Sequence, residues 1–264
     1  MFKLSIVKES HYGRHKAFHS TPSAPTSGSP TWTKVKNNHV AVNAFGWCRI
    51  VLHHVGIRIA MAKNNIPRHV GFIPDGNRRW AIDHGLPKET GYAHGINPGF
   101  LLYELCKEYG IKEASIYCFT QDNTKRPSIQ KQAFSEASVA FALEIARRGA
   151  ALLVVGDETS TQFPKELIKF RQRQGDGIKV NLLVNYGWEW DLVGLKNGGL
   201  RSEDVSRLDL IIRWGGGRRL SGFLPVQSVY ADFYVRDEYW PDFDPQHFEQ
   251  ALAWYKKQDQ TLGG

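Results

Sequence analysis

Short apolar runs alternate with amphipathic segments over most of the chain after about residue 66. The runs predict five strands, at 69–73, 114–119, 151–156, 180–185 and 208–213. Helical patterns lie between and after them, at 98–109, 130–149, 162–174 and 245–257. The strand candidates are nearly continuously apolar, which is typical of strands covered on both faces of a parallel sheet. The alternation therefore predicts an α/β domain, with ligands beyond the carboxyl ends of the strands.

The first sixty residues have a different pattern. Residues 19–31 (HSTPSAPTSGSPT) are rich in Ser, Thr, Pro and Gly, which predicts a disordered linker. Residues 40–62 are apolar but interrupted by charged side chains, and two interpretations stay open for them. They form an amphipathic helix on a membrane surface or against the body, or Met61 is the natural start and the upstream part is dispensable. We expect a disordered or partly helical extension over 1–60 and one folded domain over 61–264.

Composition restricts the possible classes of protein and partner only slightly. The chain has 264 residues, 42% of them hydrophobic, which is enough for one core. Its net charge of +8 points to an anionic partner, either nucleic acid, a lipid headgroup or a phosphorylated substrate. Cys106 and Cys118 lie in apolar runs without metal spacing, so we expect buried free thiols and a reducing, cytoplasmic setting. No stretch resembles a secretory signal, and no apolar run reaches about eighteen residues.

The residues after the first strand carry the first candidate chemistry. Asp75 follows that strand, and a helix is expected to begin within residues 76–81. Free N–H groups at a helix N-terminus, together with Arg78 and Arg79, would make a diphosphate site. A single carboxylate beside phosphates suits Mg²⁺. The spacing alone leaves a second interpretation open, in which Asp75 is a helix N-cap with a local ion pair.

A second cluster follows the last predicted strand. Arg213 ends that strand, and three glycines, Arg219 and Ser221 come after it. Glycines allow close approach of the backbone to an anion, which the arginines would hold. On its own, the pattern is equally typical of a glycine turn with solvated arginines. Two strand ends with the same chemistry favour an anion site.

A third stretch, 117–127, brings polar side chains to another strand end. Thr120, Asn123 and Arg126 follow the predicted strand 114–119. Alone, this stretch is typical of a capped turn before a helix. Together with the other two clusters it predicts a cleft that holds two phosphorylated ligands at once.

These motifs resemble those of the cis-prenyltransferases, the family that includes undecaprenyl and dehydrodolichyl diphosphate synthases. The resemblance covers about residues 66–258 and rests on HVGFIPDGNRRWA, FTQDNTKRP, VVGD, NYG, LDLIIRWGGGRRLSGFL and YWPDF, in this order. It implies a Mg²⁺-dependent enzyme with prenyl diphosphate substrates. It also implies a homodimer, and a mostly parallel six-stranded sheet flanked by helices, with an apolar tunnel in the catalytic domain over 61–264.

The resemblance also implies roles for individual residues. By position, Asp75 is the Mg²⁺ ligand and acts with Asn77 and Asn123 as the catalytic set. The implied substrate-binding residues are Gly76, Arg78, Arg79, Trp80, Lys88, Thr120, Arg126, Arg213, Arg219 and Ser221. Gly76, Asn77, Arg79 and Lys88 are implied to contact the allylic donor's diphosphate, and the last three residues of the list the acceptor's diphosphate. Asn77, Thr120, Asn123 and Arg126 are implied to assist proton loss after coupling.

The chain departs from the family pattern mainly in the acceptor half. Gly217 stands where the family has a glutamate that helps to hold Mg²⁺ at the acceptor diphosphate. Other departures are Pro74 for Met, Tyr92 for His, Thr124 for Trp, and Trp188-Glu189 for Gly-Arg.

Three interpretations of the altered acceptor half stay open. Arg218 neutralises the acceptor diphosphate and ordinary elongation with isopentenyl diphosphate continues, which we place slightly ahead. Alternatively, dimethylallyl diphosphate is the acceptor in an irregular, lavandulyl-type head-to-middle coupling. The third interpretation is a non-catalytic partner subunit of a heteromeric synthase, against which the retained Asp75 counts. Separately, the extension is a candidate for peripheral membrane contact. No nucleic-acid-binding signature accompanies the positive net charge.

Overall fold

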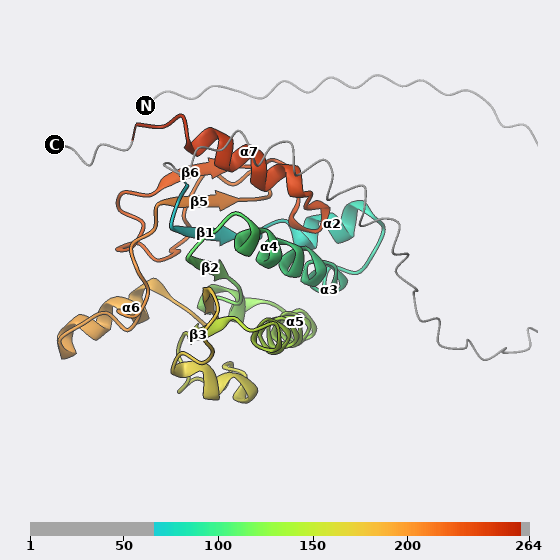
Figure 1. Ribbon diagram of the computed structural model, residues 1–264. Coiled ribbons are helices and arrows are strands. Elements are labelled where there is room, and N and C mark those ends of the chain that lie inside the picture. Colours follow the sequence, from blue (N-terminus) through green and yellow to red (C-terminus); the bar gives the residue numbers. More distant parts are fainter. Residues whose placement is uncertain (1–65, 260–264) are drawn as a thin grey trace, which may run out of the picture. The chain divides into compact units, whose positions relative to one another are not determined.

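A six-stranded parallel sheet forms the centre of the structure, a computed structural model that describes residues 66–259 (Figure 1). Its strands are β1 (His69–Ile73), β2 (Glu113–Tyr117), β3 (Ala151–Val155), β4 (Lys179–Leu183), β5 (Leu210–Arg213) and β6 (Asp232–Val235). They lie in the order β3-β4-β2-β1-β5-β6, and every neighbouring pair is parallel. The predicted parallel α/β fold is confirmed. The apolar runs did not reveal β6, because this edge strand is only half-buried.

The helices largely follow the predicted pattern. The α-helices are α2 (Asn77–Asp83), α3 (Thr90–His94), α4 (Ile96–Glu108), α5 (Ser128–Arg147), α6 (Trp188–Val193) and α7 (Pro245–Tyr255). Short 3-10 helices are η1 (Gln121–Lys125), η2 (Lys165–Arg171), η3 (Gly194–Asn197) and η4 (Trp240–Asp242). The helical segment predicted over 162–174 is present only in part, as the 3-10 helix η2. Pro164 disfavours helical geometry at the residue before it, which shortens the segment.

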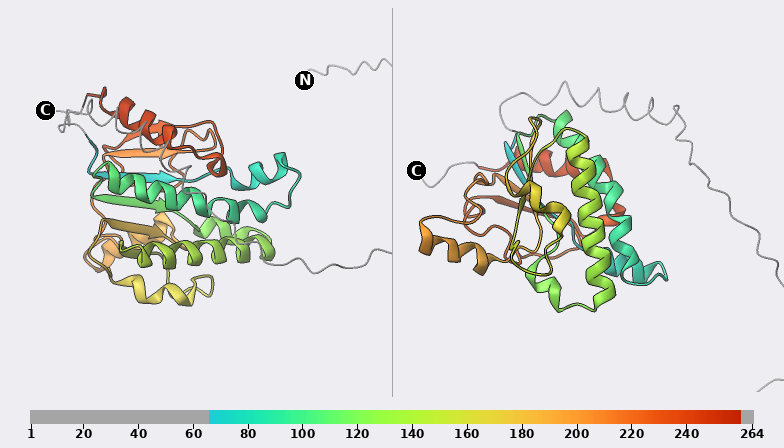
Figure 2. Two further views of the ribbon diagram at one scale, coloured as in Figure 1. Left: turned by 45° about the vertical axis from the view of Figure 1, so that its right-hand side comes forward. Right: turned by 90° about the horizontal axis from the view of Figure 1, so that it is seen from below.

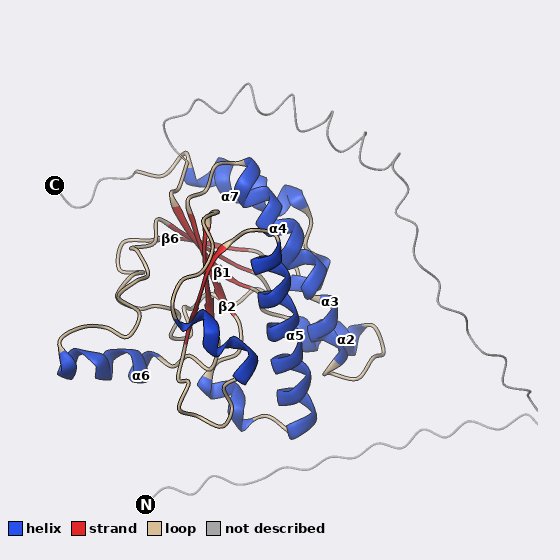
Figure 3. Ribbon diagram, turned by 60° about the horizontal axis from the view of Figure 1, so that its bottom comes forward, coloured by secondary structure: helices blue, strands red, loops and turns tan. Residues whose placement is uncertain are grey.

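Both faces of the sheet are covered, which explains the continuous apolar runs. On one face, α4, α5 and α7 pack on side chains such as Val70, Phe72 and Leu182 (Figure 3). On the other face, α6 and the segments near 205 and 223 pack on Leu153 and Ile211, among others. Alternate residues of each strand therefore enter two separate cores.

The topology creates a switch point at β1. The chain leaves β1 for β2 on one side and later returns to β5 on the other side, so the loops after these strands diverge. Ile73 lies in register with Arg213 at the carboxyl ends of β1 and β5. Figure 2 shows α2 and α3 beyond this end of the sheet. Ligand sites in open α/β sheets form at such a place.

The expected extension over 1–60 lies outside the described residues. Within 66–259, no helix combines the length and apolar character needed to cross a membrane. Cys106 is a buried free thiol as predicted, whereas Cys118 is only half-buried.

Candidate active site

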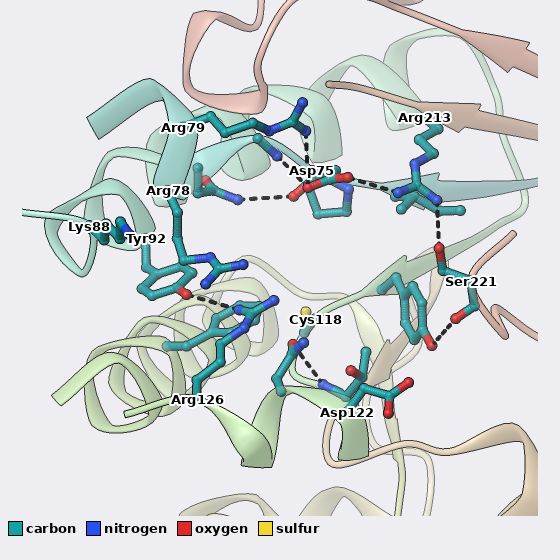
Figure 4. Close-up of a pocket in the computed structure, with 18 of the residues that line it drawn as sticks. Asp75, Arg78, Arg79, Lys88, Tyr92, Cys118, Asp122, Arg126, Arg213 and Ser221 are labelled. Carbon is teal, nitrogen blue, oxygen red and sulfur yellow. Dashed lines mark hydrogen bonds and ion pairs between the residues drawn. The ribbon is translucent and has the colours of Figure 1, made fainter. Parts of the chain in front are cut away.

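A cavity of about 540 Å³ opens at the carboxyl ends of β1, β2 and β5 (Figure 4). Its lining includes six cationic side chains and only two carboxylates. The cations are Arg78, Arg79, Lys88, Arg126, Arg213 and Arg219, and the carboxylates are Asp75 and Asp122. This excess of positive charge favours anions that carry several charges. The prediction of a cationic cleft at three strand ends agrees with this geometry.

Asp75 lies at the centre of this charge arrangement. One carboxylate oxygen accepts a hydrogen bond from Nη2 of Arg213 at 2.7 Å. The other accepts one from the backbone N–H of Gly76 at 2.6 Å and lies 3.5 Å from Nη2 of Arg79. Gly76, in a left-handed conformation, is the N-cap of α2, and no side chain caps that helix. The interpretation of Asp75 as an N-cap is therefore wrong.

Arg213 is buried and held from several sides. Besides Asp75, its guanidinium donates to the hydroxyl of Ser221 at 2.9 Å and to the carbonyl of Arg219. Its Nε is a buried donor for which the described residues provide no acceptor. An ideal Cβ on Gly217 would stand 2.6 Å from this Nε and 2.8 Å from Cζ. The absence of a side chain at residue 217 is thus what lets Arg213 reach Asp75.

A second set of bonds fixes the opposite wall of the cavity. Arg126 donates to the Tyr92 hydroxyl at 2.9 Å, as Figure 4 shows, and Arg78 donates to Gln130 at 3.3 Å. Burial raises the pKa of Tyr92, and the nearby Arg126 partly opposes this effect. Burial also lowers the pKa of Arg126. The tyrosine stays protonated at neutral pH and serves as a neutral acceptor for the guanidinium.

The polar residues after β2 form a turn at the floor of the cavity. Thr120 caps η1, and its backbone N–H donates to Oδ1 of Asn123 at 3.2 Å, so the capped turn expected from the sequence is present. Asn77 donates to the carbonyl of Pro74 at 3.0 Å, while its Oδ1 is buried without a hydrogen-bond donor among the described residues. Two buried polar atoms in this region, Oδ1 of Asn77 and Nε of Arg213, therefore have no hydrogen-bond partner among the described residues.

Twelve of the thirteen predicted site residues line the cavity, and Trp80 is the exception. Its ring packs between His84 and His94, and its N–H donates to Asp242 at 2.6 Å. The interpretation of Trp80 as substrate-binding therefore has no support in the geometry. Arg218 is not part of the lining either, because its side chain is 72% exposed and lies 3.5 Å from Asp237.

The sequence did not reveal two aromatic residues of the lining. Tyr92 and Phe134 both line the cavity, and their rings stack at 4.5 Å. The only signal was the departure from the family pattern at Tyr92. Phe134 had none, because an aromatic residue inside a helical pattern is ordinarily part of a core.

The ligands around Asp75 suit Mg²⁺ if a diphosphate supplies some of the oxygen atoms. Within residues 66–259 there is no group of three or more His, Cys, Asp or Glu side chains arranged to hold a metal. Mg²⁺ usually takes one or two carboxylates, with phosphate oxygens and water as its other ligands. Asp75, in a cationic cavity, supplies the one carboxylate, so a magnesium ion would be held jointly with a diphosphate.

A parallel sheet with a multiply cationic cavity at its switch point is the architecture of an α/β enzyme that handles phosphorylated substrates. Comparisons with known proteins give the family. The model of the putative undecaprenyl diphosphate synthase family matches residues 73–198 and 195–263. The chain therefore belongs to this family, the cis-prenyltransferases, and is a prenyltransferase.

Curated relatives agree with this assignment. An isoprenyl transferase of Streptococcus thermophilus is 29% identical over 76% of this chain and 94% of its own length. A ditrans,polycis-undecaprenyl-diphosphate synthase of Photorhabdus laumondii, described as specific for (2E,6E)-farnesyl diphosphate, is 30% identical over 75% and 90%.

A solved structure shares the fold. The lavandulyl diphosphate synthase of Lavandula x intermedia, in complex with dimethylallyl diphosphate, has a TM-score of 0.63. It is 23% identical and covers 75% of this chain and 99% of its own. At this identity the likeness concerns the fold alone.

Proposed function

We propose that the chain condenses an allylic prenyl diphosphate with isopentenyl diphosphate in a Mg²⁺-dependent reaction that gives a Z-prenyl diphosphate. The observation that carries the proposal is the cavity at the switch point, which six cationic side chains line together with Asp75. Two diphosphates together bring enough negative charge to balance such a lining. The names of the relatives, which include a farnesyl diphosphate-specific synthase, support an allylic diphosphate as donor.

The donor half of the proposed site lies around α2. Arg79 and Lys88 supply positive charge on this side of the cavity, and Asp75 supplies the carboxylate for a shared magnesium ion. When bound, Mg²⁺ neutralises charge that builds on the departing diphosphate. Arg79 also stabilises the charge on the departing diphosphate, since a guanidinium holds two phosphate oxygens at once.

The acceptor half lies around Arg213, Arg219 and Ser221. Arg213 lines the cavity, and its Nε is a donor without an acceptor among the described residues. Because Arg213 is already fixed by Ser221 and Asp75, little conformational entropy is lost when it binds. The acceptor's double bond is thereby held beside the reacting carbon of the donor, and positioning lowers the barrier further.

The condensation does not require a covalent nucleophile from the protein. The donor's carbon–oxygen bond breaks, and its electron pair leaves with the diphosphate. The acceptor's double bond then forms the new carbon–carbon bond. A proton is lost from the adjacent carbon of the acceptor and passes to the departing diphosphate, with Asn77 and Asn123 orienting the groups around it. The unpartnered Oδ1 of Asn77 supports this role.

Incubation of the purified full chain with Mg²⁺ and defined pairs of substrates tests the proposal. The pairs combine dimethylallyl or farnesyl diphosphate with isopentenyl diphosphate or with no second substrate. Z-prenyl products that form only when isopentenyl diphosphate is present support the proposal. The absence of turnover with every pair would contradict it and favour the partner-subunit interpretation.

One observation favours irregular coupling as a second candidate. Gly217 removes the glutamate expected in the acceptor half, and the exposed Arg218 does not take its place in the lining. An acceptor other than isopentenyl diphosphate, such as dimethylallyl diphosphate, is then the alternative. Product from dimethylallyl diphosphate alone, analysed for head-to-middle connectivity, would establish it.

We also propose that the chain forms a homodimer. The arm made by α6 and η3 projects from the sheet in Figure 1 and carries the exposed apolar side chains of Trp188, Val193 and Leu195. Exposed apolar surface of this kind is typical of a protein interface. Light scattering of the wild type and of Leu195→Asp tests this: we expect a dimer for the first and a monomer for the second. A monomeric wild type would refute it.

A further inference from the structure

The segment that follows Arg219 has a backbone conformation that most residues avoid. Ser221, Gly222 and Leu224 have positive φ angles of 53°, 78° and 39°. Glycine adopts this left-handed region without cost, whereas other residues keep it only where surrounding contacts hold them. Ser221 and Leu224 therefore need such contacts, and Ser221 is a residue of the proposed acceptor half.

The core holds the second half of this segment. Phe223 and Leu224 are fully buried on the face of the sheet covered by α6. An ideal Cβ on Gly71 of β1 would stand 2.5 Å from Cε1 of Phe223, so this ring packs directly on the strand. The backbone N–H of Ser228 donates to the carbonyl of Leu224 at 2.9 Å. Ser221 is exposed and takes no part in this packing.

A tyrosine from another strand holds Ser221. The hydroxyl of Tyr117, the last residue of β2, donates to the carbonyl oxygen of Ser221 at 2.9 Å. The ring of Tyr117 lies 5.2 Å from the ring of Phe223, so this one side chain contacts the segment at two points. Because β1 lies between β2 and β5, the bond spans the carboxyl end of β1, which Asp75 follows.

The direction of the Ser221 side chain matters because Arg213 depends on it. Arg213 donates to the hydroxyl of Ser221 at 2.9 Å, as Figure 4 shows, and to the carbonyl of Arg219 in the same segment. A change in the backbone at Ser221 would move these acceptors relative to the guanidinium. Small displacements of groups that position a substrate have large effects on rate, so the backbone of this segment is part of the proposed site.

We infer that Tyr117 is a positioning residue of the acceptor half: its hydroxyl holds Ser221 in the left-handed conformation and thereby fixes the Ser221 hydroxyl and Arg213 for the acceptor's diphosphate. The inference rests on the proposed function. Burial raises the pKa of Tyr117, so its hydroxyl stays protonated and able to donate at neutral pH.

Tyr117→Phe tests the inference, because it removes the hydroxyl and keeps the ring beside Phe223. Steady-state kinetics of the purified full chain with Mg²⁺, isopentenyl diphosphate and farnesyl or dimethylallyl diphosphate provides the readout. We expect the KM for isopentenyl diphosphate to rise about three- to tenfold, the effect of one neutral hydrogen bond, and the KM for the donor to stay within about twofold. An unchanged KM for isopentenyl diphosphate, or an equal rise in both KM values, would overturn the inference.

Tyr103→Phe is the matched control. The hydroxyl of Tyr103 on α4 also donates to a backbone carbonyl, that of Arg148 at 3.4 Å, and Tyr103 is not among the described residues that line the cavity. We expect both KM values to stay within about twofold of the wild type. The same rise in acceptor KM as in Tyr117→Phe would show that the effect does not depend on the bond to Ser221, and would overturn the inference.

The double variant with Ser221→Ala separates positioning from direct contact, since Tyr117 itself lines the cavity. If Tyr117 acts through Ser221, its hydroxyl has little left to position once the serine hydroxyl is gone. Tyr117→Phe should then raise the acceptor KM by at most about twofold in the Ser221→Ala background. The same three- to tenfold rise in both backgrounds would mean that the two residues act independently, which would overturn the inference.

Hydrogen exchange of the backbone amides of residues 219–224 measures the contact without any substrate. Exchange there should be faster in Tyr117→Phe than in the wild type and unchanged in Tyr103→Phe, because the segment has lost a bond that holds its conformation. Equal exchange in all three proteins would overturn the inference. Failure of the wild type to turn over any pair of substrates would instead refute the proposed function, and the exchange rates would still decide whether Tyr117 holds Ser221.

Discussion

Gly217→Ala is the smallest change that tests how the acceptor half is built. The added Cβ would stand 2.6 Å from Nε and 2.7 Å from Nη2 of Arg213. Carbon and nitrogen atoms that are not bonded need roughly 3.5 Å, so the guanidinium must move by about 1 Å. The backbone conformation of Gly217 is not in the left-handed region. Alanine is therefore tolerated by the backbone, and the effect of the substitution falls on Arg213.

The size of the effect follows from the bonds that this movement breaks. Arg213 donates to Asp75 at 2.7 Å and to Ser221 at 2.9 Å, and a hydrogen bond to a charged group contributes roughly 1.5–3 kcal/mol. The Asp75 side chain is 37% exposed, so its pair with Arg213 counts for less than a fully buried pair would. We therefore expect a total loss of about 1.5–3 kcal/mol in acceptor binding and transition-state stabilisation. This corresponds to roughly a 10–150-fold fall in kcat/KM for the acceptor.

Steady-state kinetics with each substrate varied in turn provides the assay. The KM for isopentenyl diphosphate should rise much more than the KM for the donor, because Arg213 lies in the proposed acceptor half. Arg218→Ala is the control: its side chain is 72% exposed beside Asp237, and its kinetics should stay within about twofold of the wild type. A Gly217→Ala enzyme with unchanged acceptor kinetics would refute the reasoning. A large loss in Arg218→Ala would restore the interpretation that Arg218 binds the acceptor.

Gly217→Glu separates the steric effect from the chemistry of the family's glutamate. Because the family has a glutamate at this position, we expect this substitution to raise the use of isopentenyl diphosphate. The structure adds the same displacement of Arg213 that alanine causes. Glutamate differs from alanine in one useful respect, since its carboxylate is able to accept from the unpartnered Nε of Arg213. Higher acceptor use in the glutamate variant than in the alanine variant would therefore report the carboxylate itself.

Three further predictions concern Asp75, Tyr92 and His69. Asp75→Asn keeps the shape but not the charge, and we expect turnover to fall by about 10²–10³-fold and Mg²⁺ dependence to weaken; near-wild-type turnover would refute the metal assignment. Tyr92→Phe removes the bond to Arg126, and kcat/KM should fall about tenfold with unchanged folding by circular dichroism. Burial lowers the pKa of His69 below 6.5, so the unfolded chain binds a proton first as pH falls. Urea unfolding should show stability present above about pH 6.5 and lost below it, less steeply in His69→Gln; an equal slope would contradict this.

The sequence predicted the sheet well because both of its faces are buried. Strands such as β1 and β3 are buried along their whole length, so their apolar runs are uninterrupted. The strand β6 lies at the edge and is half-buried, and its mixed composition carries no such run. The bounds of β1 match the prediction, and those of β2 to β5 differ by one or two residues at one or both ends.

The residues of the site were predictable for a related reason. Asp75, Arg213 and Thr120 follow strands whose carboxyl ends must meet in a parallel sheet, so proximity follows from topology. Pairing does not follow from topology. The bond between Asp75 and Arg213 joins residues 138 positions apart and depends on the missing side chain at Gly217. The pattern of hydrophobic and polar positions along the sequence does not predict a contact of this kind.

The side chain of Trp80 shows what a sequence motif leaves undetermined. Its place in the family motif suggested substrate contact, but direction on a helix decides what a side chain reaches. On α2, Arg78 and Arg79 turn into the cavity, while Trp80 turns toward His84, His94 and Asp242. Adjacent helix positions face different ways, so membership of a motif does not imply membership of its site.

The charged head and the apolar tail of a prenyl diphosphate are bound by different forces, and this separates the residues that drive the reaction from those that select the substrate. A diphosphate has the same charge whether its tail is dimethylallyl or farnesyl, so the arginines of the cavity cannot distinguish donors by length. Selection by length must arise where the hydrocarbon tail lies, and a smaller space beside the cavity is lined by apolar side chains such as Phe134 and Phe141. Arg79→Lys should therefore lower kcat/KM for all donors by a similar factor and leave their ratio unchanged. Phe141→Ala should change the ratio, because this ring lines the adjoining apolar space; a changed ratio for Arg79→Lys and an unchanged one for Phe141→Ala would contradict this division.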